Sequence, residues 1–165
     1  KIMIQGCPSD TIAIQKILGP LAKAHINVDM IVQSFPVLQK KKTMDFYFTV
    51  SRSDYDKALR IAQMQGELMD VVAVVGDDQV AKVSALGSGM VDHYGVANKF
   101  FEVLATHNIP VYLTSTSEIK ISVLVPQEKA KQATEVIHHT FIEGVWDPTV
   151  EYAQESSSEM ERTIQ

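Results

Sequence analysis

The apolar residues of the chain recur with two different periods, and stretches of each period alternate along the sequence. A period of two, typical of half-buried strands, is clearest over residues 44–50 and 119–125. Spacings of three and four residues, typical of amphipathic helices, begin at Thr11. The first half predicts the order strand, helix, strand, strand, helix, strand, with strands at 1–5, 27–34, 44–50 and 69–75 and helices from 11 onward and at 51–65.

The second half repeats this order. It predicts strands at 81–86, 110–115, 119–125 and 149–153, and helices at 94–107 and 127–141. The halves also correspond residue by residue, with 1–6 matching 82–87 and 28–30 matching 111–113. Each half is therefore predicted to be an α+β, ferredoxin-like βαββαβ unit, whose antiparallel sheet is covered by two helices. The expected units are residues 1–78 and 79–153, followed by a polar tail at 154–165 that is expected to be disordered.

Several local features follow from residue type. Ser9 or Asp10 is expected to cap the first helix, Pro20 to kink it, and Gly66 to end the second helix in a left-handed conformation. The strand at 27–34 has apolar residues on both faces, which favours burial over an edge position. The helix residues expected to face inward are Tyr55, Ala58, Leu59, Ala62, Ala97, Phe100, Phe101, Leu104, Ala130, Ala133, Val136, Ile137 and Phe141.

The composition of the chain argues against binding to nucleic acid and to membranes. The chain of 165 residues has a formal charge of -5, and its one cationic run, residues 40–42, reads as a solvated loop, so we expect no nucleic-acid partner. No apolar run reaches the roughly 20 residues that a membrane span needs. The single cysteine, Cys7, excludes an internal disulfide and fits a reducing compartment, so we expect a cytoplasmic protein with no membrane partner.

The chain shows no catalytic constellation, and we expect no catalytic site, metal or cofactor in it. His138 and His139 are adjacent on a helix and point about 100° apart, which does not make a two-ligand face. Cys7 has no base predicted beside it and is interpreted as an inert thiol. The run that begins at Gly87 starts like a dinucleotide fingerprint, but the third glycine is replaced by Asp92.

Two loops between a strand and a helix, residues 6–12 and 87–97, are the candidate binding elements. Each leaves unpaired N–H groups at a helix N-terminus, which can receive a carboxylate. Polar strand positions accompany both loops, Asp29 and Gln33 in the first half and Thr116–Glu118 in the second. Together they could hold a zwitterionic amino acid. The alternatives are that Asp29 is an ordinary polar strand residue, that Ser117 and Glu118 only form a turn, and that Gly95 only starts a helix.

The residues that carry a resemblance are Asn27–Gln33, Thr116–Leu124, Asp77–Ser84, Gly87-x-Gly89-Met90 and Gly95-Val96-Ala97. In these runs the chain resembles the regulatory pair of ACT domains of aspartate kinase, over about residues 1–152. The resemblance implies a regulatory part of that enzyme, either a C-terminal fragment or a separate small (beta) subunit. The kinase domain, which uses ATP and magnesium to phosphorylate the aspartate side chain, would then be a partner outside this sequence.

The resemblance also implies the effectors, lysine or threonine, which such proteins bind between paired ACT units for feedback inhibition. A second ACT pair is therefore an expected partner, in a homodimer, and terminal strands are able to exchange between units. Carried over to this sequence, the first site uses the 6–12 loop with Asn27, Asp29 and Gln33. The second site uses Met90, His93, Gly95, Val96, Ala97, Val111, Thr116, Ser117 and Glu118.

The chain departs from the family pattern in both loops. The family's Asp-x-Pro-Gly is Ser9-Asp10-Thr11-Ile12 here, and its His-Pro-Gly is His93-Tyr94-Gly95. The family's Asn-x-Asn-x-Glu is replaced by residues 108–112, with Pro110 and Tyr112. Two alternatives therefore stay open: a non-sensing dimerisation module, and an ACT pair of another amino-acid enzyme or of a transcriptional regulator.

Overall fold

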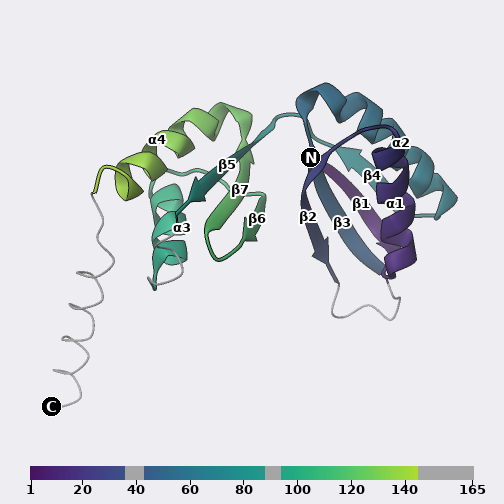
Figure 1. The fold of residues 1–165 in the computed structure, drawn as a ribbon, viewed down its shortest axis with the longest axis horizontal. Helices are drawn as coiled ribbons and strands as arrows, with labels where there is room; N and C mark the ends of the chain where they lie inside the picture. Colours follow the sequence, from purple (N-terminus) through teal and green to yellow (C-terminus); the bar gives the residue numbers. More distant parts are fainter. Residues whose placement is uncertain (36–42, 88–93, 145–165) are drawn as a thin grey trace, which may run out of the picture. The chain divides into compact units, whose positions relative to one another are not determined.

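The computed structural model describes residues 1–35, 43–87 and 94–144. The contacts within the chain divide it into two compact units, a first unit of Lys1–Asp78 and a second unit that begins at Gln79. The elements in chain order are β1 (Ile2–Pro8), α1 (Thr11–Lys23), β2 (Val28–Ser34), β3 (Thr43–Val50), α2 (Tyr55–Leu68), β4 (Ala73–Gly76), β5 (Val80–Leu86), α3 (Val96–Thr106), β6 (Leu113–Thr116), β7 (Lys120–Pro126) and α4 (Ala130–Phe141) (Figure 1). Short 3-10 turns, Arg52–Asp54 and Gln127–Lys129, precede α2 and α4.

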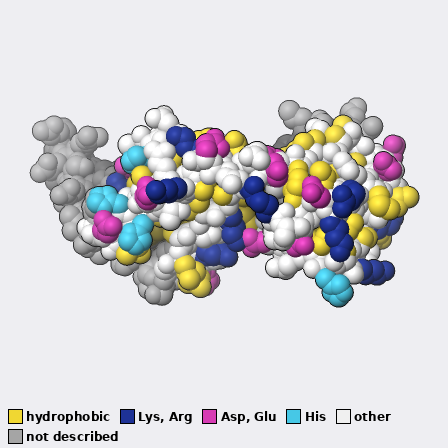
Figure 2. Space-filling model, turned by 90° about the horizontal axis from the view of Figure 1, so that it is seen from above, with side chains coloured by type: hydrophobic (Ala, Val, Ile, Leu, Met, Phe, Trp, Pro, Cys, Tyr) yellow, Lys and Arg dark blue, Asp and Glu magenta, His cyan; other side chains and the backbone are white. Residues whose placement is uncertain are grey.

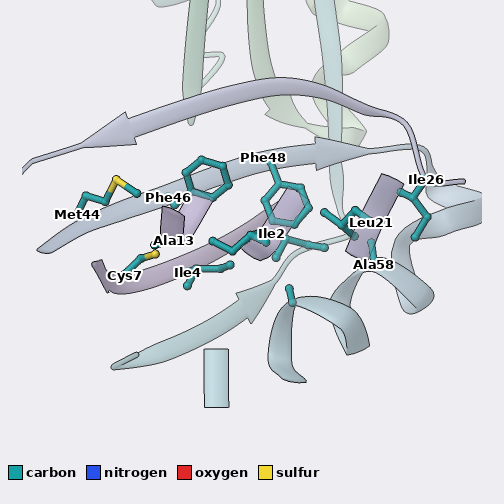
Figure 3. Close-up of a cluster of buried hydrophobic side chains, with 12 residues drawn as sticks. Ile2, Ile4, Cys7, Ala13, Leu21, Ile26, Met44, Phe46, Phe48 and Ala58 are labelled. Atoms are coloured by element: carbon teal, nitrogen blue, oxygen red, sulfur yellow. The ribbon is translucent and has the colours of Figure 1, made fainter. Parts of the chain in front are cut away.

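The first unit is a complete ferredoxin-like βαββαβ fold. Its four strands are antiparallel neighbours in the order β2-β3-β1-β4. Side chains of β1 and β3, with Phe46 and Phe48 fully buried, pack against α1 and α2 to form the core (Figure 3). The predicted fold class is confirmed for this unit, since two helices share one core with one face of an antiparallel sheet.

The second unit repeats the arrangement as far as the structure describes it. Its strands follow the order β5-β7-β6 and are antiparallel. Val83, Ile121, Val123 and Val125 of the sheet share a core with Phe100 and Leu104 of α3 and with Ala133 and Ile137 of α4. The predicted strand at 149–153, the tail at 154–165 and the cationic run at 40–42 lie outside the described residues.

One prediction about the sheet of the first unit is wrong. The strand at 27–34 was expected to be buried on both faces, but β2 is an edge strand in which only Met30 is buried. Ile31, which supports the apolar pattern, is 45% exposed. An apolar residue on each face does not require a central position, because an edge strand can also present apolar side chains to a partner.

The burial predicted along β7 is partly wrong. Ile121 and Val123 are buried as expected, but Ile119 lies in the turn before the strand and is 48% exposed. Ser122, which the alternation of residues 119–125 predicts on the polar face of the strand, is only 2% exposed. It lies directly between Ser84 of β5 and Ser115 of β6, so a central position in the sheet buries a residue that its polarity would place outside.

The helix predictions need three corrections. Gly66 does not end α2: it is buried inside the helix, and the left-handed residue is Asp70, with φ of 52°. Consequently the strand predicted at 69–75 shrinks to β4, since Met69 and Asp70 complete the end of α2. In α3, Ala97 is exposed and Phe101 is 36% exposed, while Val103 is buried instead.

The start of α1 is confirmed. Asp10 is its N-cap, and the Oδ1 atom of Asp10 accepts a hydrogen bond from the N–H of Ala13 at 2.7 Å. The helix continues through Pro20 to Lys23, so proline does not end it, and the expected kink stays a prediction. No helix in the described ranges is long and apolar enough to cross a membrane.

Candidate functional site

Polar residues gather at one end of the strands of the second sheet, where β5 and β6 stop. We call this end of the sheet its loop edge, or edge. β5 and β6 both run antiparallel to β7, so their C-terminal ends lie at the same edge. There the N–H of Gly87 donates to the carbonyl oxygen of Ile119 at 2.9 Å, and the N–H of Ser117 donates to that of Lys120 at 2.8 Å. The second bond closes the turn between β6 and β7. Thr116, Ser117 and Glu118 are all exposed at this turn.

The N-terminus of α3 lies at this same edge. The helix follows β5 and runs back to the opposite edge, where β6 begins. Gly95 is its N-cap, with φ of 85°, and no described side chain caps the first turn. A left-handed conformation of this kind is the one that glycine adopts at little cost. The start of α3 at Gly95–Ala97 therefore lies at the end of the sheet that carries Thr116–Glu118. That these residues together bind a ligand stays a prediction.

Of the three other residues of the predicted second site, one lies elsewhere and two are not described. Val111 lies before the start of β6, five residues from Thr116 and so roughly 17 Å away along the strand. It packs against the core of the second unit. Met90 and His93 lie outside the described residues.

The first unit has the equivalent edge, but its helix N-terminus is different. The Asp10 carboxylate already accepts an N–H of the first turn of α1. Gly6, with φ of 71°, donates its N–H to Oδ1 of Asp45 at 3.0 Å. This loop therefore uses two of the chain's own carboxylates as acceptors, whereas the α3 N-terminus has no capping side chain among the described residues.

The predicted residues of the first site lie at opposite ends of β2. Gln33 pairs with Phe46 beside the 6–12 loop, whereas Asp29 is four residues earlier, roughly 13 Å along the strand. Asn27 precedes β2 and lies farther still. Figure 3 shows the same separation in the core, with Cys7 and Met44 at one end and Ile26 at the other. Within a single unit, only Gln33 lies near the loop.

The described side chains offer little for catalysis. Cys7 is buried, and burial raises the pKa of its thiol, with a further contribution from the Asp10 carboxylate. A raised pKa disfavours the reactive thiolate. Among the described residues no group of three His, Cys, Asp or Glu side chains is placed to hold a metal ion. On the face shown in Figure 2, cationic and anionic side chains are interspersed.

One residue at the first edge was missed by sequence reasoning. Asp45 occupies a polar position of an alternating strand and reads as an ordinary exposed residue. Its hydrogen-bond partner, Gly6, is 39 residues away in the sequence, so the pair becomes visible only when the strands are aligned. The one feature of the sequence that could have indicated this contact is Gly6, the glycine directly after the first predicted strand.

Comparison with known proteins agrees with this architecture. Residues 83–141 match the family model described as the ACT domain. An aspartate kinase of Pseudomonas fluorescens (strain SBW25) is 43% identical over 141 residues, which are 86% of this chain and 33% of that enzyme. A solved structure of aspartokinase alpha and beta subunits is 42% identical, with a TM-score of 0.75, covering 85% of this chain and 90% of that one. The chain belongs to the ACT-domain regulatory family of aspartate kinase.

A third relative agrees with this assignment. The regulatory subunit of aspartate kinase from Thermus thermophilus, solved in its ligand-free form, is 29% identical to the ACT chain with a TM-score of 0.73. The match covers 85% of the ACT chain and 90% of that subunit. The ACT chain spans about a third of the length of the Pseudomonas relative. The ACT chain is therefore similar to the regulatory part of aspartate kinases and not to the whole enzyme.

Proposed function

We propose that the ACT chain is the allosteric, effector-binding region of an aspartate kinase and that it binds lysine or threonine. The observation that carries this proposal is the edge of the second unit. There the first turn of α3, with no capping side chain among the described residues, lies at the same sheet edge as the exposed residues Thr116, Ser117 and Glu118.

The chemistry of this edge suits an amino acid. The N–H groups of the first helical turn and the positive end of the helix dipole favour a carboxylate. The carboxylate of Glu118 can accept from an ammonium group, and the hydroxyls of Thr116 and Ser117 can bond to either end of the ligand. The second unit thus offers hydrogen-bond donors for the carboxylate and acceptors for the ammonium group of a zwitterionic amino acid.

For the first unit we propose a site completed by a second copy of the chain. β2 is an edge strand and exposes Ile31, while Ile12 of α1 and Phe35 beyond β2 are 66% and 55% exposed. Two β2 strands that pair antiparallel place the start of one beside the end of the other. Asn27 and Asp29 of one copy would then approach Gln33 and the 6–12 loop of its partner, which a single unit keeps apart.

Feedback inhibition requires the effector to bind two arrangements of the protein with different affinity. A coupling of about 1–3 kcal/mol is typical and changes affinity by about 5- to 150-fold. The partner is the kinase domain of the same enzyme, in the same chain or in a separate subunit. ATP and magnesium are expected in that domain.

The test is a thermal-shift and calorimetric titration of the ACT chain with lysine, threonine, methionine and diaminopimelate, singly and in pairs. An effector at about 100 times its dissociation constant adds roughly 2.7 kcal/mol of stability. For a small unit that unfolds by itself this corresponds to a rise of about 10–20 °C in its unfolding midpoint. A folded chain whose midpoint does not move with any of the four contradicts the proposal.

Variants locate the site. Ser117→Ala and Glu118→Gln are expected to weaken binding about tenfold or more, because the first removes a hydrogen bond to a charged group and the second removes the negative charge that faces the ammonium group. Asp29→Ala tests the first unit. Glu102→Gln is the matched control, since Glu102 is an exposed acid of the same unit that pairs with Lys99 at 3.1 Å on α3. Equal affinity in Ser117→Ala, Glu118→Gln and Glu102→Gln refutes the assigned site.

A second candidate function is a dimerisation module that binds no effector. It is favoured by the Asp10 cap, which occupies an N–H at the N-terminus of α1, and by the exposed apolar residues around β2. This candidate expects a concentration-dependent dimer without any amino-acid response. Analytical ultracentrifugation alongside the titrations separates the two functions.

A further inference from the structure

The backbone of the first unit carries a bulge where β1 approaches its loop. Ile4 pairs with Phe46, but the next pair is Cys7 with Met44, so Gln5 and Gly6 together oppose the single residue Asp45. Gly6 adopts φ of 71° at this point. A bulge of this kind bends the strand and redirects the chain that follows. It therefore sets the direction in which the 6–12 loop leaves the sheet.

Asp45 joins this bulge to the end of β2. Its Oδ1 atom accepts the hydrogen bond from the N–H of Gly6 at 3.0 Å. On its other side Asp45 pairs with Ser34, the residue after Gln33. Asp45 on β3 thus lies between the bulge of β1 and the end of β2, which together form the loop edge of the first unit.

The second unit lacks this device. Gly87 corresponds to Gly6, and the position equivalent to Asp45 is Lys120, an ammonium group that cannot accept a hydrogen bond. The N–H of Gly87 donates instead to the backbone oxygen of Ile119. The pairing of β5 with β7 runs without a shift from Val80 to Leu86. Among the described residues, the bulge and the carboxylate occur together in the first unit, and neither occurs at the equivalent positions of the second.

We infer that Asp45 is a positioning residue, which holds the Gly6 bulge and thereby sets the affinity of the first unit's loop for an effector without touching it. A carboxylate suits this role because hydrogen bonds to a charged acceptor are shorter and stronger than those between neutral groups. The effector half of this inference rests on the proposed function. The bulge half does not, since it concerns a bond within the chain.

The experiment compares Asp45→Ala with its rescue Asp45→Asn, whose amide oxygen can still accept from Gly6, and with Lys120→Ala, the matched change in the second unit. Hydrogen exchange of the Gly6 amide, measured by NMR, is expected to accelerate at least about tenfold in Asp45→Ala, to accelerate less in Asp45→Asn, and to stay near the wild-type rate in Lys120→Ala. Asp45→Glu, which keeps the charge but moves the carboxylate, gives the same comparison if the alanine variant does not fold.

Effector titrations provide the second readout. They are followed by NMR, with the amide signal of Gln33 giving the affinity of the first unit and that of Thr116 the affinity of the second. Asp45→Ala is expected to weaken binding at the first unit about tenfold and to leave the second unit unchanged. Unchanged Gly6 exchange in Asp45→Ala overturns the inference, and so does an equal loss of affinity in both units, which indicates general destabilisation. A wild-type chain that binds no amino acid refutes the proposed function and the effector half together, whereas the exchange rates still decide whether Asp45 holds the bulge.

Discussion

Gly66 shows how a single residue can be fixed by a neighbouring strand. It is buried inside α2, and a Cβ atom added to it would lie 2.6 Å from Cγ2 of Val74 and 3.0 Å from Cγ2 of Val71. Both neighbours are valines, whose side chains have little rotamer freedom. The glycine is thus explained by close packing of the helix against the start of β4, and not by the end of the helix.

We predict that Gly66→Ala destabilises the first unit. Overpacking of this degree costs about 1–3 kcal/mol, which exceeds the gain of about 1 kcal/mol that alanine brings to a helix interior. Urea denaturation followed by circular dichroism measures the difference. Gly144→Ala is the control: Gly144 has φ of 75° and no atom of the described residues within 4 Å of an added Cβ, so only backbone strain of about 1 kcal/mol is expected. A more stable Gly66→Ala variant would contradict the packing argument.

At the scale of elements, three helices end in the same way. His25, Asp70 and Asn108 follow α1, α2 and α3 with φ of 59°, 52° and 51°. In each case the next residue donates its N–H to a carbonyl five positions back, as in Ile26 to Leu21 and Ile109 to Leu104. Ile26 and Ile109 are themselves buried, which is the apolar contact that accompanies a Schellman motif.

These helix ends predict stabilising substitutions. A side chain in the left-handed region costs roughly 1–2 kcal/mol, and glycine avoids this cost but loses more entropy on folding. His25→Gly is expected to stabilise the first unit by about 0.5–1 kcal/mol, and Asn108→Gly to have a smaller effect, because asparagine tolerates this conformation better than histidine. Thermal unfolding of both variants measures this order. A destabilising His25→Gly would show that the imidazole makes a compensating contact.

Sequence periodicity predicts these elements well where a residue's environment depends on its own element. The alternation in β3 and the spacing in α1 both reflect one buried face, and both are confirmed. Periodicity fails where burial depends on which strands become neighbours. It does not reveal that β2 is an edge strand, or that Ser122 lies in a central strand between two neighbouring strands.

At the scale of the whole molecule, the candidate site depends on both kinds of information. The polar run at Thr116–Glu118 and the glycine before α3 are local features, and the sequence alone predicts their grouping at one sheet edge. Asp45 depends on a strand pairing across 39 residues, so no local pattern reveals it. The separation of Asp29 from Gln33 follows from the direction of a strand, which shows why a motif read as one cluster can span two ends of a unit.

The two separate hydrophobic cores lead to a prediction of how the molecule unfolds. The core that contains Phe46 is drawn from the first unit, and the core that contains Phe100 from the second, with no residue in common. Both phenylalanines are fully buried, so replacing either by alanine is expected to cost about 3–5 kcal/mol. Because the cores are separate, Phe46→Ala should lower the stability of the first unit and leave the second largely unchanged, and Phe100→Ala should do the reverse.

Amide hydrogen exchange resolves the two units within one chain. In Phe46→Ala, protected amides of β1 and β3 are expected to exchange at least about 100-fold faster, while those of β7 change by much less. Phe100→Ala supplies the reciprocal control. An equal loss of protection in both units, from either variant, would show that the chain unfolds as one cooperative body. The effector-induced stabilisation would then be shared as well, so the unit-by-unit affinities that test Asp45 would have to be measured by ligand titration and not by melting.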